Sequence, residues 1–249
     1  MIAAVKGIEE MAMTTSAYLL DGMADNLKRA GLHRVTVSLD SLNDEVFQQM
    51  NGRGFSTAKV LKGISAAKEA EFDVIKINAV VQKGVNEHTL LELVEWCREN
   101  NIVPRFIEYM DVGTLNGWKL DEVFSAAEIV SLIDSEYPVE PADPNYLGEV
   151  AKRYRFKDGN GEFGVISSVS QPFCGDCTRA RLSPEGQFVT CLFAESGKDL
   201  RKLLRRGVDD RELSKEMANV WAVRDDKYSE DRSSMTVLRK KVEMYHIGG

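Results

Sequence analysis

The chain has 249 residues, of which 43% are hydrophobic, and it carries a formal net charge of −7. This length can bury one large core or two smaller ones, and the acidic balance argues against a broad surface for binding nucleic acid. No apolar run reaches the roughly 18 residues that a membrane-spanning helix needs, and the N-terminus lacks the pattern of a secretory signal. We therefore expect a cytoplasmic protein with no nucleic-acid or membrane partner.

Strand-like and helix-like segments alternate through the first half of the chain. Strand composition marks four segments: residues 9–15, 34–40, 74–81 and 103–110. Helical periodicity marks three segments: residues 20–30, 56–70 and 86–100. This βα repeat predicts right-handed crossovers and a parallel sheet, either open or curved into a barrel.

The carboxyl ends of such strands are where a parallel sheet usually carries its functional groups. The side chains that the sequence places there are Thr14, Thr15, Ser38, Asp40, Lys76, Asn78, Glu108 and Met110. Each could instead be an inward-facing polar residue of a barrel or a cap for the following helix. Lys76 stands out because Ile75 and Ile77 flank it, so its charge on a barrel interior would need an anionic partner.

A looser, proline-punctuated connection follows the repeat and leads into a second region. Its expected elements are a helix at 126–135, strands at 151–156 and 163–169, and helices at 199–206 and 210–222. Asp158-Gly159-Asn160-Gly161 is a strong hairpin signal between the two strands, and the polar segment 224–234 has the composition of a mobile one. The predicted organisation is an α/β domain over residues 1–137 and a small α+β region over 138–249.

Three of the four cysteines lie in one short stretch, as Cys174-x-x-Cys177 and Cys191, which does not resemble a disulfide framework. Two thiolates three residues apart can bind one metal ion or one edge of a cluster, and a third can join them across a hairpin. The intervening sequence suits such a hairpin, with Pro184-Glu185-Gly186 as the turn between alternating segments. The three sulfurs could therefore converge.

The identity of the metal centre depends on a fourth ligand, for which Cys97 is the only cysteine left. Cys97 continues the apolar periodicity of Leu90 and Val94, which is typical of a buried helix position. An iron–sulfur cluster can leave one iron open, whereas structural zinc is closed by four ligands. From the residues alone, an open cluster, a zinc site and a redox pair or disulfide all stay possible. Arg179 and Arg181 add a preference for phosphate or carboxylate.

On these residues the chain resembles the GTP 3',8-cyclases, radical S-adenosylmethionine (SAM) enzymes of molybdenum cofactor biosynthesis. The likeness runs from about Ile8 to Gly249 and rests on Phe-Cys-x-x-Cys-x-Arg-x-Arg-Leu from Phe173, on Cys-Leu-Phe from Cys191, and on the terminal Ile-Gly-Gly. It implies a partial (βα) barrel with about four of six βα units, followed by a C-terminal region that carries a [4Fe–4S] cluster. It also implies cyclisation of GTP to (8S)-3',8-cyclo-7,8-dihydroguanosine 5'-triphosphate, and a functional link to cyclic pyranopterin monophosphate synthase.

The same resemblance implies a role for individual residues. The ligands of the C-terminal cluster, whose open iron binds the guanine of GTP, would be Cys174, Cys177 and Cys191. The residues at GTP would be Thr14, Lys76, Arg179, Ala180 and Arg181, and those at SAM would be Ser38 and Met110. The terminal Gly-Gly would reach toward the active site.

Two motifs of that family are absent from these 249 residues. They are Cys-x-x-x-Cys-x-x-Cys, which supplies the ligands of a second, SAM-cleaving [4Fe–4S] cluster, and Gly-Gly-Glu-Pro, which contacts SAM. Both precede the part that residues 1–15 resemble, so we expect the first two βα units to be missing and the chain alone to be unable to cleave SAM. The edge near residues 9–15 would then favour a homo-oligomer.

Two alternatives to a GTP 3',8-cyclase are a non-catalytic zinc- or cluster-containing nucleotide-binding protein and another radical SAM enzyme with an auxiliary cluster. The Arg-x-Arg insertion and the Ile-Gly-Gly end argue against the second of these.

Overall fold

The computed structural model describes residues 1–113, 116–175 and 177–232 of the chain. These residues form two compact units, Met1–Tyr109 with Leu120–Ser170, and Met110–Lys119 with the chain from Gln171 onward. The predicted boundary at 137/138 falls inside the first unit. The terminal Ile-Gly-Gly lies outside the described residues.

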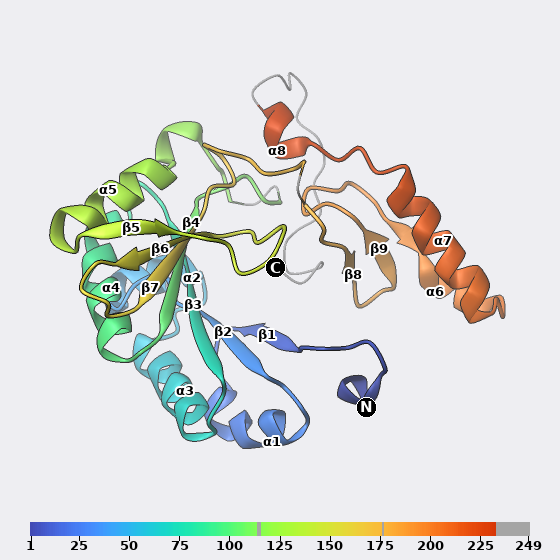
Figure 1. The fold of residues 1–249 in the computed structure, drawn as a ribbon, viewed down its shortest axis with the longest axis horizontal. Helices are drawn as coiled ribbons and strands as arrows, with labels where there is room; N and C mark the ends of the chain where they lie inside the picture. Colours follow the sequence, from blue (N-terminus) through green and yellow to red (C-terminus); the bar gives the residue numbers. More distant parts are fainter. Residues whose placement is uncertain (114–115, 176, 233–249) are drawn as a thin grey trace. The chain divides into compact units, whose positions relative to one another are not determined.

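The first unit is built on a sheet whose described part has seven strands, in the order β1-β2-β3-β4-β7-β6-β5 (Figure 1). The strands are β1 (Ala12–Thr15), β2 (Arg34–Ser38), β3 (Val74–Val81), β4 (Val103–Glu108), β5 (Val139–Ala142), β6 (Lys152–Phe156) and β7 (Glu162–Ile166). The pairs from β1 to β4 and on to β7 are parallel, whereas β7, β6 and β5 pair antiparallel. The predicted α/β class and parallel sheet are therefore confirmed.

Helices connect the strands and cover one face of this sheet, with α3, α4 and α5 along its outer side in Figure 1. They are α1 (Ala24–Arg29), α2 (Asp44–Asn51), α3 (Thr57–Glu69), α4 (Leu90–Glu99) and α5 (Ala126–Glu136). Short 3₁₀ turns lie at Ile2–Ala4, Leu20–Gly22, Glu87–Thr89 and Leu120–Glu122. No described helix combines the length and apolar character needed to cross a bilayer.

Burial alternates along β3, and this alternation separates the two faces of the sheet. The residues buried beneath the helices are Ile75, Ile77, Ala79 and Val81. In α3 the matching buried positions, spaced as one helical stripe, are Val60, Ile64 and Ala67. Each large aliphatic side chain buried there contributes roughly 1.5–3 kcal/mol. Lys76 and Asn78 point to the opposite face, as their intermediate burial indicates.

A glycine allows α3 to approach the chain before it. A Cβ atom on Gly63 would lie 2.4 Å from the carbonyl oxygen of Ala17, closer than real contacts allow. Ala17 is itself buried and has a positive φ of 58°. The close approach places α3 directly beside the turn that follows β1.

Several element boundaries differ from those that the sequence predicts. The first strand begins at Ala12 and not near residue 9, and the predicted helices at 20–30 and 86–100 each begin as a 3₁₀ turn. The helix α2 and the strand β5 were not predicted. Pro141 reads as a break in the sequence, but β5 is an edge strand and an edge strand tolerates proline.

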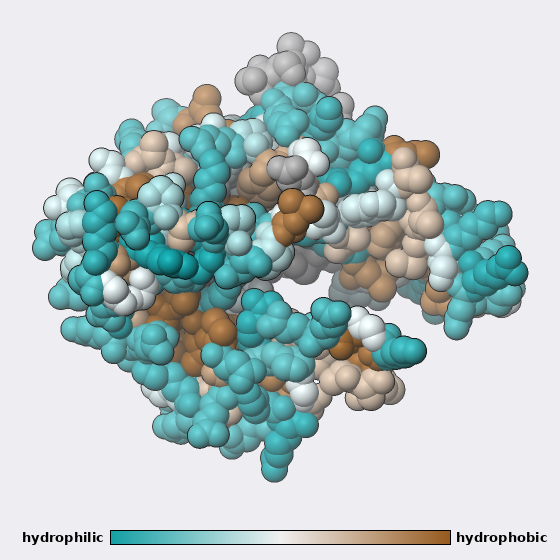
Figure 2. Space-filling model, in the orientation of Figure 1, coloured by the Kyte–Doolittle hydropathy of each residue, from teal (hydrophilic) through white to brown (hydrophobic). Residues whose placement is uncertain are grey.

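The second unit contains a small antiparallel sheet in the order β10-β9-β8. Its elements are β8 (Arg181–Leu182), β9 (Gln187–Val189), β10 (Lys198–Asp199), α6 (Leu200–Arg205), α7 (Asp210–Ala222) and α8 (Tyr228–Asp231). No residue of α7 is buried, and Figure 2 shows hydrophilic side chains over its far end.

One prediction for the second region is wrong. The strands at 151–156 and 163–169 do not form its small sheet, because as β6 and β7 they extend the large sheet of the first unit beyond β4. Residues 224–232 of the segment predicted to be mobile contain α8 and make several side-chain hydrogen bonds, such as that from Tyr228 to Asp111, and the last two residues of that predicted segment, 233 and 234, lie outside the described residues.

Candidate functional site

The face of the sheet opposite the helices carries polar side chains in register. Thr14 pairs with Thr36, and Thr36 with Lys76, so these residues form one row across β1, β2 and β3. Two residues further along the strands, Ser38 pairs with Asn78. Three predicted site residues are therefore brought to one surface. We call the following set the polar face: Thr14, Thr36, Ser38, Lys76, Asn78 and Arg105.

Arg105, like Thr36, is a member of the polar face that the sequence did not single out. It pairs with Asn78 across β3 and β4, and its Nε donates a hydrogen bond to Asn78 Oδ1 over 2.9 Å. Its Nη2 donates to Thr36 Oγ1 over 3.3 Å, so the guanidinium group spans two neighbouring strands. A signal was present, because Arg105 interrupts the buried residues Pro104 and Phe106 as Lys76 interrupts its isoleucines.

Positive charge accumulates on the polar face. Burial lowers the pKa of Lys76, and the charges of Arg105 and Arg34 lower it further, against a weaker opposing effect of Glu149. Burial also lowers the pKa of Arg105. Both shifts mean that the charged forms are disfavoured by their surroundings. A bound polyanion would offset this, so the polar face is suited to an anionic ligand.

Glu108, one of the strand-end candidates, has a structural role. It is fully buried, and its carboxylate accepts hydrogen bonds from the amides of Ala126 and Val169, both over 2.7 Å. It also accepts from the amide of Ser170 over 2.8 Å and from the Ser170 hydroxyl. One carboxylate thus fixes the end of β4, the start of α5 and the last residues of the first unit.

Asp40 and Thr15 are also engaged with the backbone. Asp40 Oδ1 accepts a hydrogen bond from the amide of Val80 over 2.9 Å, and burial raises the pKa of Asp40 to about 6. Thr15 Oγ1 accepts from the amide of Ala17 over 3.0 Å. These side chains cap loops at the carboxyl ends of β1 and β2, which is the alternative that the sequence left open for them.

The three cysteines lie in the second unit, on a turn and on the hairpin that follows it. The amide of Cys177 donates to the carbonyl oxygen of Cys174 over 3.3 Å, which closes the turn between them. β8 and β9 pair through Arg181 and Val189, and Cys191 follows two residues after β9 ends. The predicted hairpin is therefore confirmed, with Ala180 exposed just before its first strand.

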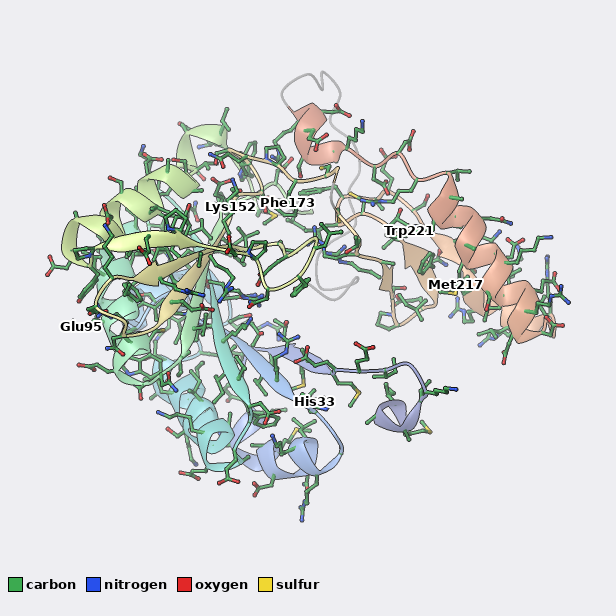
Figure 3. All side chains as sticks on the ribbon, viewed as in Figure 1. His33, Glu95, Lys152, Phe173, Met217 and Trp221 are labelled. Carbon is green, nitrogen blue, oxygen red and sulfur yellow. The ribbon has the colours of Figure 1, made fainter. Side chains whose placement is uncertain are left out.

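Arg179 contacts the cysteine turn directly. Its Nε and Nη2 each lie 3.3 Å from Cys177 Sγ as donors, and its guanidinium group lies 5.3 Å from the ring centre of Phe173, labelled in Figure 3. Burial alone would raise the pKa of Cys177, but hydrogen bonds from Arg179 and the charges of Arg179 and Arg224 lower it. Burial raises the pKa of Cys191. The surroundings of Cys177 therefore favour the thiolate, which is the form that binds a metal.

The donor set fits a cysteine-ligated cluster in its chemistry. Three thiols and two arginines lie on this turn and the following hairpin, and the charges of Cys174 and Cys191 interact, as do those of Arg181 and Cys177. Among the described residues, no three or more His, Cys, Asp or Glu side chains are grouped closely enough to hold a metal ion as they stand. Cys97 belongs to the core of the first unit, as predicted, and is fully buried on α4.

Met110 is the first residue of the loop that joins the second unit. Its carbonyl oxygen accepts hydrogen bonds from the amide of Val112 over 2.9 Å and from Asn116 Nδ2 over 3.0 Å. The next residue, Asp111, is held by Tyr228 and accepts from Arg232 Nε over 2.9 Å. Of the predicted site residues, the first unit therefore carries Thr14, Ser38 and Lys76, and the second carries Met110, Cys174, Cys177, Arg179, Ala180, Arg181 and Cys191.

Two family models match the chain. Residues 102–230 match Molybdenum Cofactor Synthesis C, and residues 1–97 match the Radical SAM superfamily. Together they account for most of both units and for every predicted site residue.

Curated relatives carry one shared name. The GTP 3',8-cyclase of Xanthomonas campestris pv. campestris strain B100 is 49% identical, covering 100% of this chain and 73% of that protein. The GTP 3',8-cyclase of Staphylococcus carnosus strain TM300 is 45% identical, covering 98% of this chain and 73% of that protein. Among solved structures, SuiB of Streptococcus suis aligns with 90% of this chain and 51% of its own at 17% identity and a TM-score of 0.47, which is too distant to bear on function. The chain belongs to the GTP 3',8-cyclase family of the radical SAM superfamily.

Proposed function

We propose that this chain binds GTP at a [4Fe–4S] cluster held by Cys174, Cys177 and Cys191. The observation that carries the proposal is the hydrogen bonding of Arg179 to the Cys177 thiol, because it places a cation against one of the three thiols and helps to lower the pKa of that thiol. A cluster on three cysteines keeps one iron open, and in this family that iron would take the guanine of GTP.

We propose five residues of this chain for GTP binding. They are Thr14, Lys76, Arg179, Ala180 and Arg181. The polar face supports this proposal for Lys76, since burial and then repulsion from Arg105 and Arg34 lower its pKa, and a triphosphate would offset both. Burial lowers the pKa of Arg181 and the charge of Arg179 adds to this effect, so the same reasoning applies to Arg181.

The reaction we propose for the family site is cyclisation of GTP to (8S)-3',8-cyclo-7,8-dihydroguanosine 5'-triphosphate, the substrate of cyclic pyranopterin monophosphate synthase. When bound, SAM and its own [4Fe–4S] cluster supply the radical that this cyclisation needs. Ser38 and Met110 are the residues of this chain that we propose for SAM. The chain has no Cys-x-x-x-Cys-x-x-Cys, so the 249 residues alone should not cleave SAM, and 5'-deoxyadenosine above a no-enzyme control would contradict this.

A homo-oligomer is a further part of the proposal. β1 pairs with β2 on one side and is the terminal strand of the described sheet. Exposed edge strands favour pairing with another chain. Light scattering of the purified chain tests this, and a monomer that unfolds cooperatively would contradict it.

Metal analysis of cysteine variants tests the cluster directly. After anaerobic reconstitution, the wild-type chain should hold about four irons, and Cys191→Ser should lose most of them. Cys97→Ala is the matched control, because Cys97 is buried on α4 and should not affect iron content. Equal iron in Cys191→Ser and the wild type, or stoichiometric zinc in the wild type, would contradict the proposal and favour a zinc-containing nucleotide-binding protein.

A further inference from the structure

A short segment of the second unit contacts both arms of the cysteine hairpin. We call residues 224–232, which include α8, the strap. The two arms are the turn from Cys174 to Cys177 and the segment around Cys191. Because a three-cysteine site lacks a fourth protein ligand, the spacing of its arms has to be set by groups that are not ligands.

A continuous series of hydrogen bonds crosses between the arms through the strap. Arg224 donates from Nη1 to the carbonyl oxygen of Cys177 and from Nε to Asp226 Oδ2 over 3.2 Å. Thr190 donates from its hydroxyl to the same Asp226 oxygen over 2.5 Å. Thr190 directly precedes Cys191. One carboxylate oxygen therefore joins the main chain of the first arm to the second arm.

The ion pair at the centre of this series is sheltered. The Arg224 side chain is 13% exposed and the Asp226 side chain is 28% exposed, and the guanidinium group lies 5.1 Å from the ring centre of Trp221 on α7 (Figure 3). A pair of this kind is screened less by solvent than one on the open surface. It can therefore hold its geometry better than the mobile ion pairs of a surface.

Two further contacts of the strap touch the same two arms. The ring of Tyr228 stacks on Phe193, two residues after Cys191, with 4.3 Å between the ring centres. Glu230 accepts a hydrogen bond from the amide of Gly175, between the first two cysteines, over 3.2 Å. Tyr228 also donates to Asp111 over 2.5 Å, so the loop that begins at Met110 is attached to the strap as well.

We propose that Asp226 is a positioning residue for the three thiols. It acts through its hydrogen bonds with Arg224 and Thr190 to set the separation of Cys177 and Cys191. The inference rests on the proposed cluster at these cysteines. Because that site has no fourth protein ligand, the strap would set the separation of the two arms that carry the cysteines.

The test compares Asp226→Ala, Asp226→Asn and Thr190→Val with Asp225→Ala in the full 249-residue chain. Asp225 is the matched control because it is the neighbouring residue, has the same charge and is exposed. Two readouts are independent of enzyme activity. The first is the rate at which a chelator removes iron from the reconstituted chain, together with the electron paramagnetic resonance (EPR) line shape of the reduced cluster. The second is the affinity of the metal-free chain for Cd²⁺, followed by thiolate charge-transfer absorbance.

Asp226→Ala should lose iron about tenfold faster than the Asp225→Ala control, with a broadened EPR line and a similarly weakened Cd²⁺ affinity. Asp226→Asn keeps an acceptor for Thr190 and should recover part of the difference. Thr190→Val removes one hydroxyl at nearly constant shape, so it tests the same series even where Asp226→Ala folds poorly. Equal iron loss and equal Cd²⁺ affinity in Thr190→Val and Asp225→Ala would overturn the proposal.

The two proposals fail in different ways. If the wild-type chain holds no iron but binds Cd²⁺ through its thiolates, and Asp226→Ala weakens that binding, the cluster assignment fails and the positioning role stands. If the wild type holds iron and the Asp226 and Thr190 variants match Asp225→Ala in both readouts, the positioning role alone fails.

Discussion

Arg105 and Asn78 are joined across β3 and β4 by a hydrogen bond of 2.9 Å from the arginine Nε to the asparagine Oδ1. The bond holds the guanidinium group on the polar face, in the row of residues beside that of Lys76. Arg105 is thereby held on the same surface as Lys76 before any ligand is present. Burial disfavours the charged forms of both side chains, and this effect on stability can be measured.

Lys76→Met should separate stability from ligand binding. Removing the charge relieves repulsion from Arg105 and Arg34, so the melting temperature of the ligand-free chain should stay the same or rise. The shift in melting temperature on adding GTP should fall, since one charge-assisted hydrogen bond contributes about 1.5–3 kcal/mol. Thermal unfolding with GTP and with guanosine measures both effects.

Lys215→Met is the control for this substitution. It also removes one lysine charge, but Lys215 is exposed on α7 and is not part of the polar face. If GTP raises the melting temperature of Lys76→Met as much as that of Lys215→Met, the proposed contact between Lys76 and the triphosphate is wrong.

Glu108→Gln should destabilise the first unit strongly. The buried carboxylate accepts hydrogen bonds from three backbone amides and one hydroxyl, and an amide side chain would point an N–H group at some of these donors. Leaving such donors unsatisfied in a fully buried site costs about 2–4 kcal/mol. Urea unfolding gives the difference, with Glu95→Gln on the exposed side of α4 as control (Figure 3). A Glu108 variant as stable as the control would show that the carboxylate is dispensable.

Asp40 should make the folded chain less stable as the pH rises from about 4 to about 6, which is the opposite of the usual effect of a carboxylate. Its pKa is raised by burial from the ordinary 3.8 to about 6, so the folded chain binds this proton more tightly than the unfolded chain does. The contribution of Asp40 to stability is therefore greatest below about pH 4, falls as the pH rises to about 6, and is constant above that. The full change is up to about 3 kcal/mol.

Asp40→Asn isolates this contribution from the other carboxylates. Asparagine keeps the acceptor for the Val80 amide but does not ionise. The variant should gain stability relative to the wild type between about pH 4 and pH 6 and differ by a constant amount above pH 6. Urea unfolding across this range measures the difference, and a difference independent of pH would contradict the assignment of the raised pKa to Asp40.

The sequence predicted the elements whose signals are local. β3 was predicted with its observed bounds, because four apolar residues alternate with others across its whole length. α2 was missed although Asn43 caps its start, accepting from the amide of Val46 over 3.1 Å, and Gly52 ends it with a φ of 60°. Those end signals are weak without a clear apolar stripe, and only Phe47 of α2 is buried.

The site was predictable to the extent that it repeats a motif. The cysteine hairpin and Lys76 could be found from spacing and alternation. The strap could not, because its polar composition is that of a mobile segment and its order comes from single hydrogen bonds between residues far apart in the chain. Arg224 and Cys177, for example, are 47 positions apart. Side-chain contacts at such separations leave no periodic pattern in a sequence.

EPR spectroscopy of the reconstituted, reduced chain with and without GTP tests whether the three cysteines hold a cluster that binds GTP. A cluster on Cys174, Cys177 and Cys191 with an open iron predicts about four irons per chain and a spectrum that changes when GTP binds. Guanosine should produce a similar change if the guanine is the group that reaches the iron. An iron-loaded chain whose spectrum is the same with and without GTP would contradict the claim.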